Sequence, residues 1–228
     1  MFSNREDAAR QLAQRLKSLP LKDPLVLAIP RGGVVIGAVL ARELRAELDV
    51  VLARKLRAPF QPELAIGAIG EDGEEYLNEF AGEFTGGTGD YLRREREHQL
   101  SEIDRRRKLL RGARPAASVT GRSVIVTDDG IATGSTMFAA LHVLKGKQPC
   151  DIIVGVPVAP PDTLEKIRPL CSHVECLLAP EYFRAIGAFY RDFEQVEDEE
   201  VVRLLRECQQ SRPATGAGKA GPARDDRM

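Results

Sequence analysis

One stretch decides the fold, and it reads Val124-Ile125-Val126-Thr127-Asp128-Asp129-Gly130-Ile131-Ala132-Thr133-Gly134-Ser135-Thr136. An apolar strand runs into two adjacent carboxylates, then into a loop of small and hydroxyl residues, and then into a helix. In an open parallel sheet, ligands bind at the carboxyl ends of the strands. The first turn of a helix has unpaired N–H groups, and its dipole favours an anion. The stretch therefore predicts a phosphate site at a strand–helix junction.

Two aspartates beside a phosphate site would repel the ligand unless it also carries hydroxyl groups and a magnesium ion. Asp128 and Asp129 can then accept hydrogen bonds from ribose hydroxyls, directly or through metal-bound water. Gly130 and Gly134 let the backbone approach a phosphate closely. Further donors come from the hydroxyls of Thr133, Ser135 and Thr136. The ligand that this pattern implies is a sugar phosphate.

Outside this stretch, short apolar runs alternate with helical patterns. The runs are typical of buried parallel strands and lie at 25–29, 49–53, 123–127, 151–156 and 174–178. Helices are predicted at 3–19, 34–48, 90–111, 136–145, 161–167 and 198–208, the first with Ser3 and Glu6 at capping-box spacing. A hairpin is predicted from 64–70 and 74–78. The alternation predicts an α/β fold with a mostly parallel twisted sheet flanked by helices.

The composition indicates one globular domain. We expect residues 1–208 to form it and 209–228, rich in Gly, Pro, Ala and charge, to be a disordered tail. The net charge of −1 argues against nucleic acid or an anionic membrane as a partner. No apolar run approaches the roughly 20 residues that span a bilayer. The polar first residues and four scattered cysteines predict a cytoplasmic protein.

The stretch 124–136 resembles the phosphoribosyl diphosphate loop of type I phosphoribosyltransferases, which has a hydrophobic strand, two acids and a T-G-S/T-T-like phosphate loop. The resemblance covers residues 25–160 and implies that family's fold, with a small hood or lid region. By position, Asp128 and Asp129 would hold the ribose hydroxyls and bind Mg²⁺ through water. The substrate-binding loop would comprise Gly130, Ile131, Ala132, Thr133, Gly134, Ser135 and Thr136.

Two further segments are expected at the same edge of the sheet. Arg31, Gly32 and Gly33 follow the first strand, where the resembled family grips the diphosphate, and Arg31 can donate two hydrogen bonds to phosphate oxygens. Arg54 and Lys55 are predicted to end the second core strand and look like basic residues that neighbour the diphosphate in relatives. A solvated Arg-Lys pair remains the alternative for these two.

Three features of the sequence concern the acceptor. Hypoxanthine–guanine enzymes carry an acid where this chain has Ala132, so the loop is more similar to the adenine and amide-type relatives. The hairpin 64–78 occupies the place of the family's mobile lid, where Glu74 and Glu75 are either proton-transfer candidates or exposed carboxylates. A hood over the base and a satellite core are equal alternatives for the aromatic residues Tyr182, Phe183, Phe189, Tyr190 and Phe193.

The resemblance implies an enzyme that moves ribose 5-phosphate from phosphoribosyl diphosphate to a nitrogen nucleophile, a nucleobase in purine salvage, and releases diphosphate. Asp128, Asp129 and Arg31 would be catalytic, with Mg²⁺ as cofactor. Alternatives are a ligand-sensing regulator or a diphosphokinase-type enzyme on this fold, and a homodimer is open. RNA contact by the basic segment 93–114 is a minor alternative to a solvated helix. The chain lacks a P-loop ending and a G-x-G-x-x-G motif, which argues against nucleotide hydrolases and dinucleotide oxidoreductases.

Overall fold

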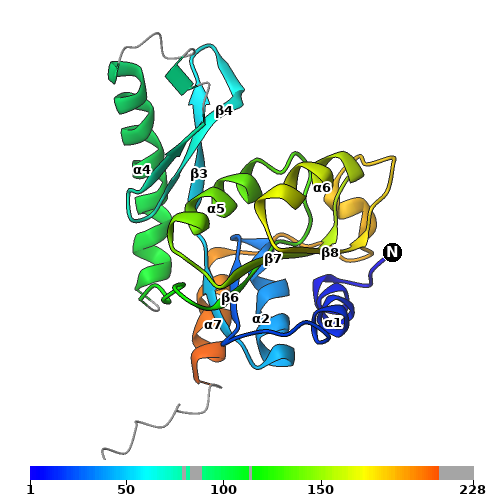
Figure 1. Ribbon diagram of the computed structural model, residues 1–228. Helices are drawn as coiled ribbons and strands as arrows, with labels where there is room; N and C mark the ends of the chain where they lie inside the picture. Colours follow the sequence, from blue (N-terminus) through cyan, green and yellow to red (C-terminus); the bar gives the residue numbers. More distant parts are fainter. Residues whose placement is uncertain (79–80, 83–88, 113–114, 211–228) are drawn as a thin grey trace, which may run out of the picture.

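A five-stranded parallel sheet forms the centre of the computed structural model, which describes residues 1–78, 81–82, 89–112 and 115–210 (Figure 1). Its strand order is β2-β1-β6-β7-β8, and every neighbouring pair is parallel. The strands are β1 (Leu25–Ala28), β2 (Glu47–Val50), β6 (Ser123–Thr127), β7 (Asp151–Val158) and β8 (His173–Leu178). Because β1 and β6 are neighbours, the residues that follow them meet at one edge of the sheet.

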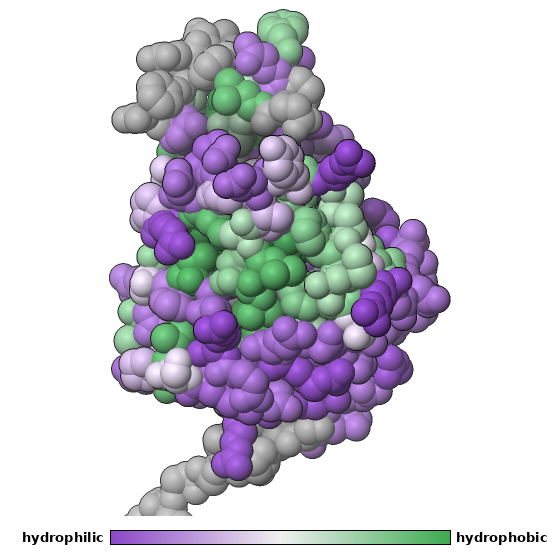
Figure 2. Space-filling view, turned by 90° about the vertical axis from the view of Figure 1, so that its right-hand side faces the viewer, coloured by the Kyte–Doolittle hydropathy of each residue, from purple (hydrophilic) through white to green (hydrophobic). Residues whose placement is uncertain are grey.

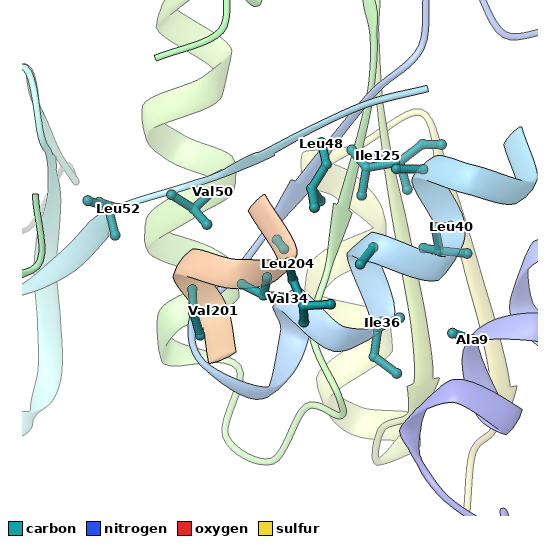
Figure 3. Packing of buried hydrophobic residues seen from close by; sticks show 14 of the residues in the cluster. Ala9, Val34, Ile36, Leu40, Leu48, Val50, Leu52, Ile125, Val201 and Leu204 are labelled. Carbon is teal, nitrogen blue, oxygen red and sulfur yellow. The ribbon is translucent and has the colours of Figure 1, made fainter. Parts of the chain in front are cut away.

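Helices cover both faces of this sheet. One face carries α1 (Arg5–Leu16), α2 (Gly32–Leu44) and α7 (Asp198–Gln210), and the other carries α5 (Ser135–Gly146) and α6 (Pro161–Ile167). Successive strand residues point to opposite faces, so Leu48 and Ile125 pack against α2 (Figure 3), while Val124 and Val126 belong to the core under α5. Burial of each such side chain contributes about 1.5–3 kcal/mol.

A second, antiparallel sheet stands beside the core. Its order is β3-β4-β5, from β3 (Ala53–Ala58), β4 (Gln61–Gly70) and β5 (Glu75–Leu77). The long helix α4 (Gly89–Arg111) packs on this sheet, and α5 contacts β3 and β4 from the core. These residues, 53–77 and 89–111, are called the arm below. Figure 1 shows the arm rising beside α5 at one side of the central sheet.

A buried ion cluster fixes the base of the arm to the core. The Arg111 guanidinium donates to Asp49 Oδ1 at 2.6 Å and to both carboxylate oxygens of Glu71. Asp49 is only 1% exposed and also accepts a 2.7 Å hydrogen bond from the Ala117 backbone N–H. Burial alone would lower the pKa of Arg111, but pairing with the two carboxylates outweighs burial and raises it. The end of α4 is therefore tied to the point where β2 leads into β3.

The segment after β8 closes the opposite side of the core, where it joins the start of the chain. Phe2 pairs with Tyr190 in a parallel bridge, with hydrogen bonds of 2.8 Å to the Phe189 carbonyl and 2.9 Å from the Arg191 N–H. The short helices η1 (Arg168–Leu170) and η2 (Ile186–Phe189) flank β8. Figure 2 shows apolar residues gathered in the middle of the face seen from the right of Figure 1, with hydrophilic residues below them.

The predicted α/β class, with its mostly parallel sheet and flanking helices, is confirmed, and the strand 123–127 and the helix 161–167 have the expected bounds. The second strand was predicted wrongly at 49–53. The helix before it ends at Leu44, because Arg45 adopts a left-handed φ of 52°, and β2 begins at Glu47. The cap of α1 is Asn4 rather than Ser3, since Asn4 Oδ1 accepts from the Asp7 N–H at 2.9 Å.

At the carboxyl end, α7 continues to Gln210, so the first two residues of the expected tail are helical. Residues 211–228 of that predicted tail lie outside the described part of the chain, as do residues 79–80, 83–88 and 113–114. None of the helices in the described residues combines the length and the apolar character needed to span a membrane.

Candidate functional site

A cleft of about 420 Å³ lies between the edge of the core sheet and the arm. The core contributes residues that follow β1 and β6 or begin α5, namely Ile29, Pro30, Asp128, Ser135 and Thr136. The arm contributes polar side chains of β3 and α4, namely Arg54, Lys55, Arg57, Gln99, Glu102 and Arg106. The cleft thus joins part of the predicted phosphate loop to a cationic wall that the sequence had only partly indicated.

The phosphate loop ends in an open helix start. Gly134 is the N-cap of α5 with a φ of 78° and has no side chain to cap the first turn, and the Ser135 N–H makes only a long 3.5 Å hydrogen bond to Thr133 Oγ1. The backbone N–H groups of this turn are therefore available to an anion. The Thr133 and Ser135 hydroxyl oxygens lie 3.2 Å apart beside it. The loop is anchored to the end of β7, because the Ile131 N–H donates to the Val158 carbonyl at 2.8 Å.

The two acids of the loop have different surroundings. Asp128 lines the cleft, and its Oδ1 accepts a 2.8 Å hydrogen bond from the Asp129 N–H. Asp129 is 9% exposed, does not line the cleft, and forms a 2.8 Å ion pair with Arg5. Burial, followed by the nearby Asp129 carboxylate, raises the pKa of Asp128 well above its usual range. Asp128 therefore lines the cleft, while Asp129 is held beside it by Arg5, and the role of both acids in holding the ribose hydroxyls stays a prediction.

Arg5 is a residue that sequence reasoning missed. Its Nε donates to Asp129 Oδ2, its Nη1 donates to the Glu194 carbonyl at 2.8 Å, and its guanidinium carbon lies 3.8 Å from the Phe193 ring centroid. The Tyr190 hydroxyl donates to the Asp129 carbonyl at 2.6 Å, and burial raises the pKa of that phenol. Asp129 is thereby fixed by α1 and by the segment after β8.

The loop after β1 meets the acids directly. A Cβ atom on Gly32 would lie 1.9 Å from Asp129 Oδ2, and one on Gly33 would lie 2.9 Å from Asp128 Cα. Both glycines therefore make room for the acidic pair at the start of α2. The Pro30–Arg31 peptide bond is cis. The Arg31 Nη1 lies 3.6 Å from Glu197 Oε2, and Arg31 does not line the cleft.

Arg54 and Lys55 reach the cleft from an element that was not predicted. They belong to β3 of the arm rather than to the end of the second core strand, which is a correction of their placement. Both nevertheless line the cleft, as the sequence hypothesis requires. Arg54 Nε donates to Gln99 Oε1 at 2.6 Å, which joins β3 to α4.

The hairpin and the aromatic segment lie away from the cleft. Glu74 and Glu75, on the predicted lid, do not line it, and Glu75 lies 3.7 Å from Arg96. Tyr190 is only 5% exposed and packs on Phe2 and Phe193, with its ring 5.0 Å from that of Phe193, and Phe183 stacks on Phe189, whereas Tyr182 is 91% exposed. Within the described residues, none of the five aromatic side chains at 182–193 lines the cleft. The packing of Tyr190 and Phe193 supports the satellite core for these two residues, to which the exposed Tyr182 does not belong.

The cleft fits a magnesium ion that arrives with its ligand. The described residues contain no group of three or more His, Cys, Asp or Glu side chains that could hold a metal by themselves. Magnesium usually keeps several waters and binds one or two carboxylates together with substrate phosphates. Asp128 supplies one such carboxylate in the cleft. Its surroundings are thus suited to Mg²⁺ bound jointly with a phosphate ester.

Comparison with known proteins agrees with the geometry. Two curated relatives from Mycobacterium tuberculosis (strains CDC 1551 / Oshkosh and H37Rv), each named "Putative phosphoribosyl transferase", are 40% identical over 231 residues. The alignment covers 100% of this chain and 52% of each relative, so the chain spans about half their length. The crystal structure of TT1426 from Thermus thermophilus is 43% identical, with a TM-score of 0.87, over 90% of this chain and 98% of that one.

The family model for the phosphoribosyl transferase domain matches residues 3–194. That range includes Arg5, the loop after β1, the arm and the whole phosphate loop. The chain therefore belongs to the phosphoribosyl transferase domain family.

Proposed function

We propose that the cleft binds phosphoribosyl diphosphate with magnesium, and that the protein transfers its ribose 5-phosphate group to a nitrogen nucleophile, with a nucleobase as the first class to test. The observation that carries the proposal is that three kinds of group line one cleft: the Asp128 carboxylate, the Ser135 end of α5, and the cations Arg54 and Lys55. Each suits one part of the ligand, namely the ribose hydroxyls, the 5-phosphate and the diphosphate.

In this proposal the start of α5 holds the 5-phosphate. Backbone N–H groups and the hydroxyls of Ser135 and Thr136 donate to its oxygens. The remaining loop residues, Gly130 to Gly134, shape that turn. Asp128 accepts from the ribose hydroxyls and lies close to the ring on which positive charge develops. Asp129, held by Arg5, orients Asp128 through its backbone N–H.

The diphosphate lies between the loop after β1 and the arm. The start of α2 at Gly32 and Gly33 offers a second helix dipole, and Arg54 and Lys55 offer positive charge. Magnesium, when bound, supplies Lewis-acid stabilisation of the departing diphosphate. An acceptor ring can lie on the apolar surface that Ile29, Val51 and Ile103 contribute to the cleft.

The test begins with calorimetry of phosphoribosyl diphosphate in the presence of Mg²⁺, followed by an assay of diphosphate release with a panel of nucleobases. Charge-assisted hydrogen bonds contribute on the order of 1.5–3 kcal/mol, so Asp128→Asn is expected to lower catalytic efficiency by about 10- to 100-fold. Asp104→Asn is the control, since Asp104 pairs with Arg107 at 3.0 Å on the outer face of α4. Equal activity of Asp128→Asn and wild type would contradict the assignment.

The same assay separates an enzyme from a ligand-sensing regulator. One observation favours the regulator: none of the five aromatic residues described at 182–193, on which a nucleobase could stack, lines the cleft. Tight binding of phosphoribosyl diphosphate without diphosphate release for any base would support that second function and reject the first.

A further inference from the structure

One face of α4 is turned toward β3 and the cleft. Glu95 and Gln99 are 7% and 2% exposed on this face. Glu95 accepts two hydrogen bonds from the Arg57 guanidinium, at 2.8 and 3.1 Å, and Gln99 accepts the one from Arg54. Arg106 follows Gln99 by seven residues, which is two helical turns, and so lies on the same face. These hydrogen bonds hold β3 against α4, and Arg106 lies near the carboxyl end of α4, which is the end nearest the core.

The Arg106 guanidinium reaches the core edge of the cleft. Its Nη1 donates to the Pro30 carbonyl oxygen at 3.5 Å, and the residue lines the cleft together with Asp128. The next residue, Arg107, does not line the cleft and pairs with Asp104, both side chains being 49% exposed. Two adjacent arginines therefore differ in direction, and one of them faces the ligand site.

The cleft concentrates positive charge around Arg106. Arg54 and Lys55 line the same cleft, together with the single arm carboxylate among its lining residues, Glu102, whose Oε2 lies 4.0 Å from Arg54 Nη1. Burial lowers the pKa of Arg106, and the neighbouring guanidiniums of Arg54 and Arg105 lower it further. Cations held this close repel one another, and a bound polyanion relieves that repulsion. The wall therefore suits a ligand group with more than one negative charge.

Arg31, the arginine that the sequence hypothesis assigns to the diphosphate, does not line the cleft, although it lies near enough to Arg106 to lower the pKa of Arg106. Arg31 pairs with Glu197, just before α7, at 3.6 Å. Among the described residues that line the cleft, the arginine in contact with the loop after β1 is Arg106, through the carbonyl of Pro30. The arm thus supplies a cation at the position where the core loop was expected to supply one.

We infer that Arg106 binds the diphosphate group of phosphoribosyl diphosphate and stabilises it as it leaves. The inference rests on the proposed function and extends it to α4. The bond between the anomeric carbon and the diphosphate oxygen breaks, and its electron pair stays on that oxygen. The acceptor nitrogen forms the new bond to carbon and releases its proton to solvent. A guanidinium can donate two hydrogen bonds to the departing phosphate and offset its growing charge.

The experiment compares Arg106→Gln with the matched control Arg107→Gln. Binding of three probes is measured by calorimetry with Mg²⁺: phosphoribosyl diphosphate, inorganic diphosphate and ribose 5-phosphate. Arg106→Gln is expected to weaken binding of the two diphosphate probes by about 10- to 100-fold, because one charge-assisted contact is lost. Ribose 5-phosphate should bind within about twofold of wild type, since it carries no diphosphate. Arg107→Gln should bind all three probes like wild type.

The outcomes are distinct. If Arg106→Gln binds inorganic diphosphate as tightly as wild type, Arg106 does not bind the diphosphate. If the variant loses affinity for ribose 5-phosphate to the same extent as for diphosphate, Arg106 acts only on structure. Either result overturns the inference. In both cases the proposed function survives, provided that wild type binds phosphoribosyl diphosphate. If wild type binds neither phosphoribosyl diphosphate nor ribose 5-phosphate, both the function and the inference are rejected.

Discussion

Replacing Arg5 by methionine should destabilise the protein strongly, because Arg5 neutralises an acid that is almost out of water. The side chains of Arg5 and Asp129 are only 11% and 12% exposed. Methionine keeps most of the apolar length of arginine but leaves the Asp129 carboxylate without its cation. Removing one partner of such a pair costs about 3–5 kcal/mol. For a chain of this size the loss corresponds to a decrease in melting temperature of roughly 6–20 °C.

The assay is chemical denaturation followed by circular dichroism, on a double-mutant cycle of wild type, Arg5→Met, Asp129→Asn and the double variant. The double variant removes both charges, so it should be more stable than the sum of the single losses predicts, with a coupling of about 1–3 kcal/mol. A loss below about 1 kcal/mol for Arg5→Met, or additive single effects, would refute the claim that the pair is desolvated and coupled.

Three further predictions concern the arm and the phosphate loop. Arg111→Met should cost about 3–5 kcal/mol in denaturant unfolding, because it strands the carboxylates of Asp49 and Glu71; a loss under about 1 kcal/mol would contradict this. Gly134→Ala should cost about 1–3 kcal/mol in thermal unfolding, since φ is 78° and the new Cβ would lie 2.7 Å from the Phe138 ring; unchanged stability would argue against that geometry. Burial opposes ionisation of Glu95, but hydrogen bonds from Arg57 and Gln99 outweigh it and lower its pKa. The ionised Glu95 carboxylate therefore contributes fully to folding stability above its unfolded-state pKa of about 4.3. This contribution is lost as the pH falls through the lower pKa that Glu95 has in the folded protein. The stability gap between wild type and Glu95→Gln should narrow from about pH 6 to about pH 3, and a constant gap would count against this pairing.

The parts of the fold that could be predicted are those with a local signal. A strand buried on both faces is a continuous apolar run, which is why the bounds of β6 were predicted correctly. Two acids followed by a loop of glycine, serine and threonine residues indicated where that strand ends and where a ligand-binding loop begins. Asp128, Ser135 and Thr136 of that loop line the cleft.

The parts that could not be predicted depend on contacts between distant segments. The strand β3 alternates buried apolar residues with cations, so its start resembled the polar end of the preceding core strand. The inward face of α4, with Glu95 and Gln99, was hidden in a basic segment whose overall pattern is that of a solvated helix. Arg5 and Asp129 are 124 residues apart, and a single ion pair at such separation leaves no periodic trace.

The bridge between Phe2 and Tyr190 connects residues 1–5 to the segment that holds Asp129 in place, although these residues lie far from Asp129 in the sequence. Proteolytic clipping of the first five residues would remove both that bridge and the guanidinium that fixes Asp129. Protein that has lost residues 1–5 should therefore differ in ligand affinity from protein that retains them, and intact mass is worth recording before any binding curves are compared.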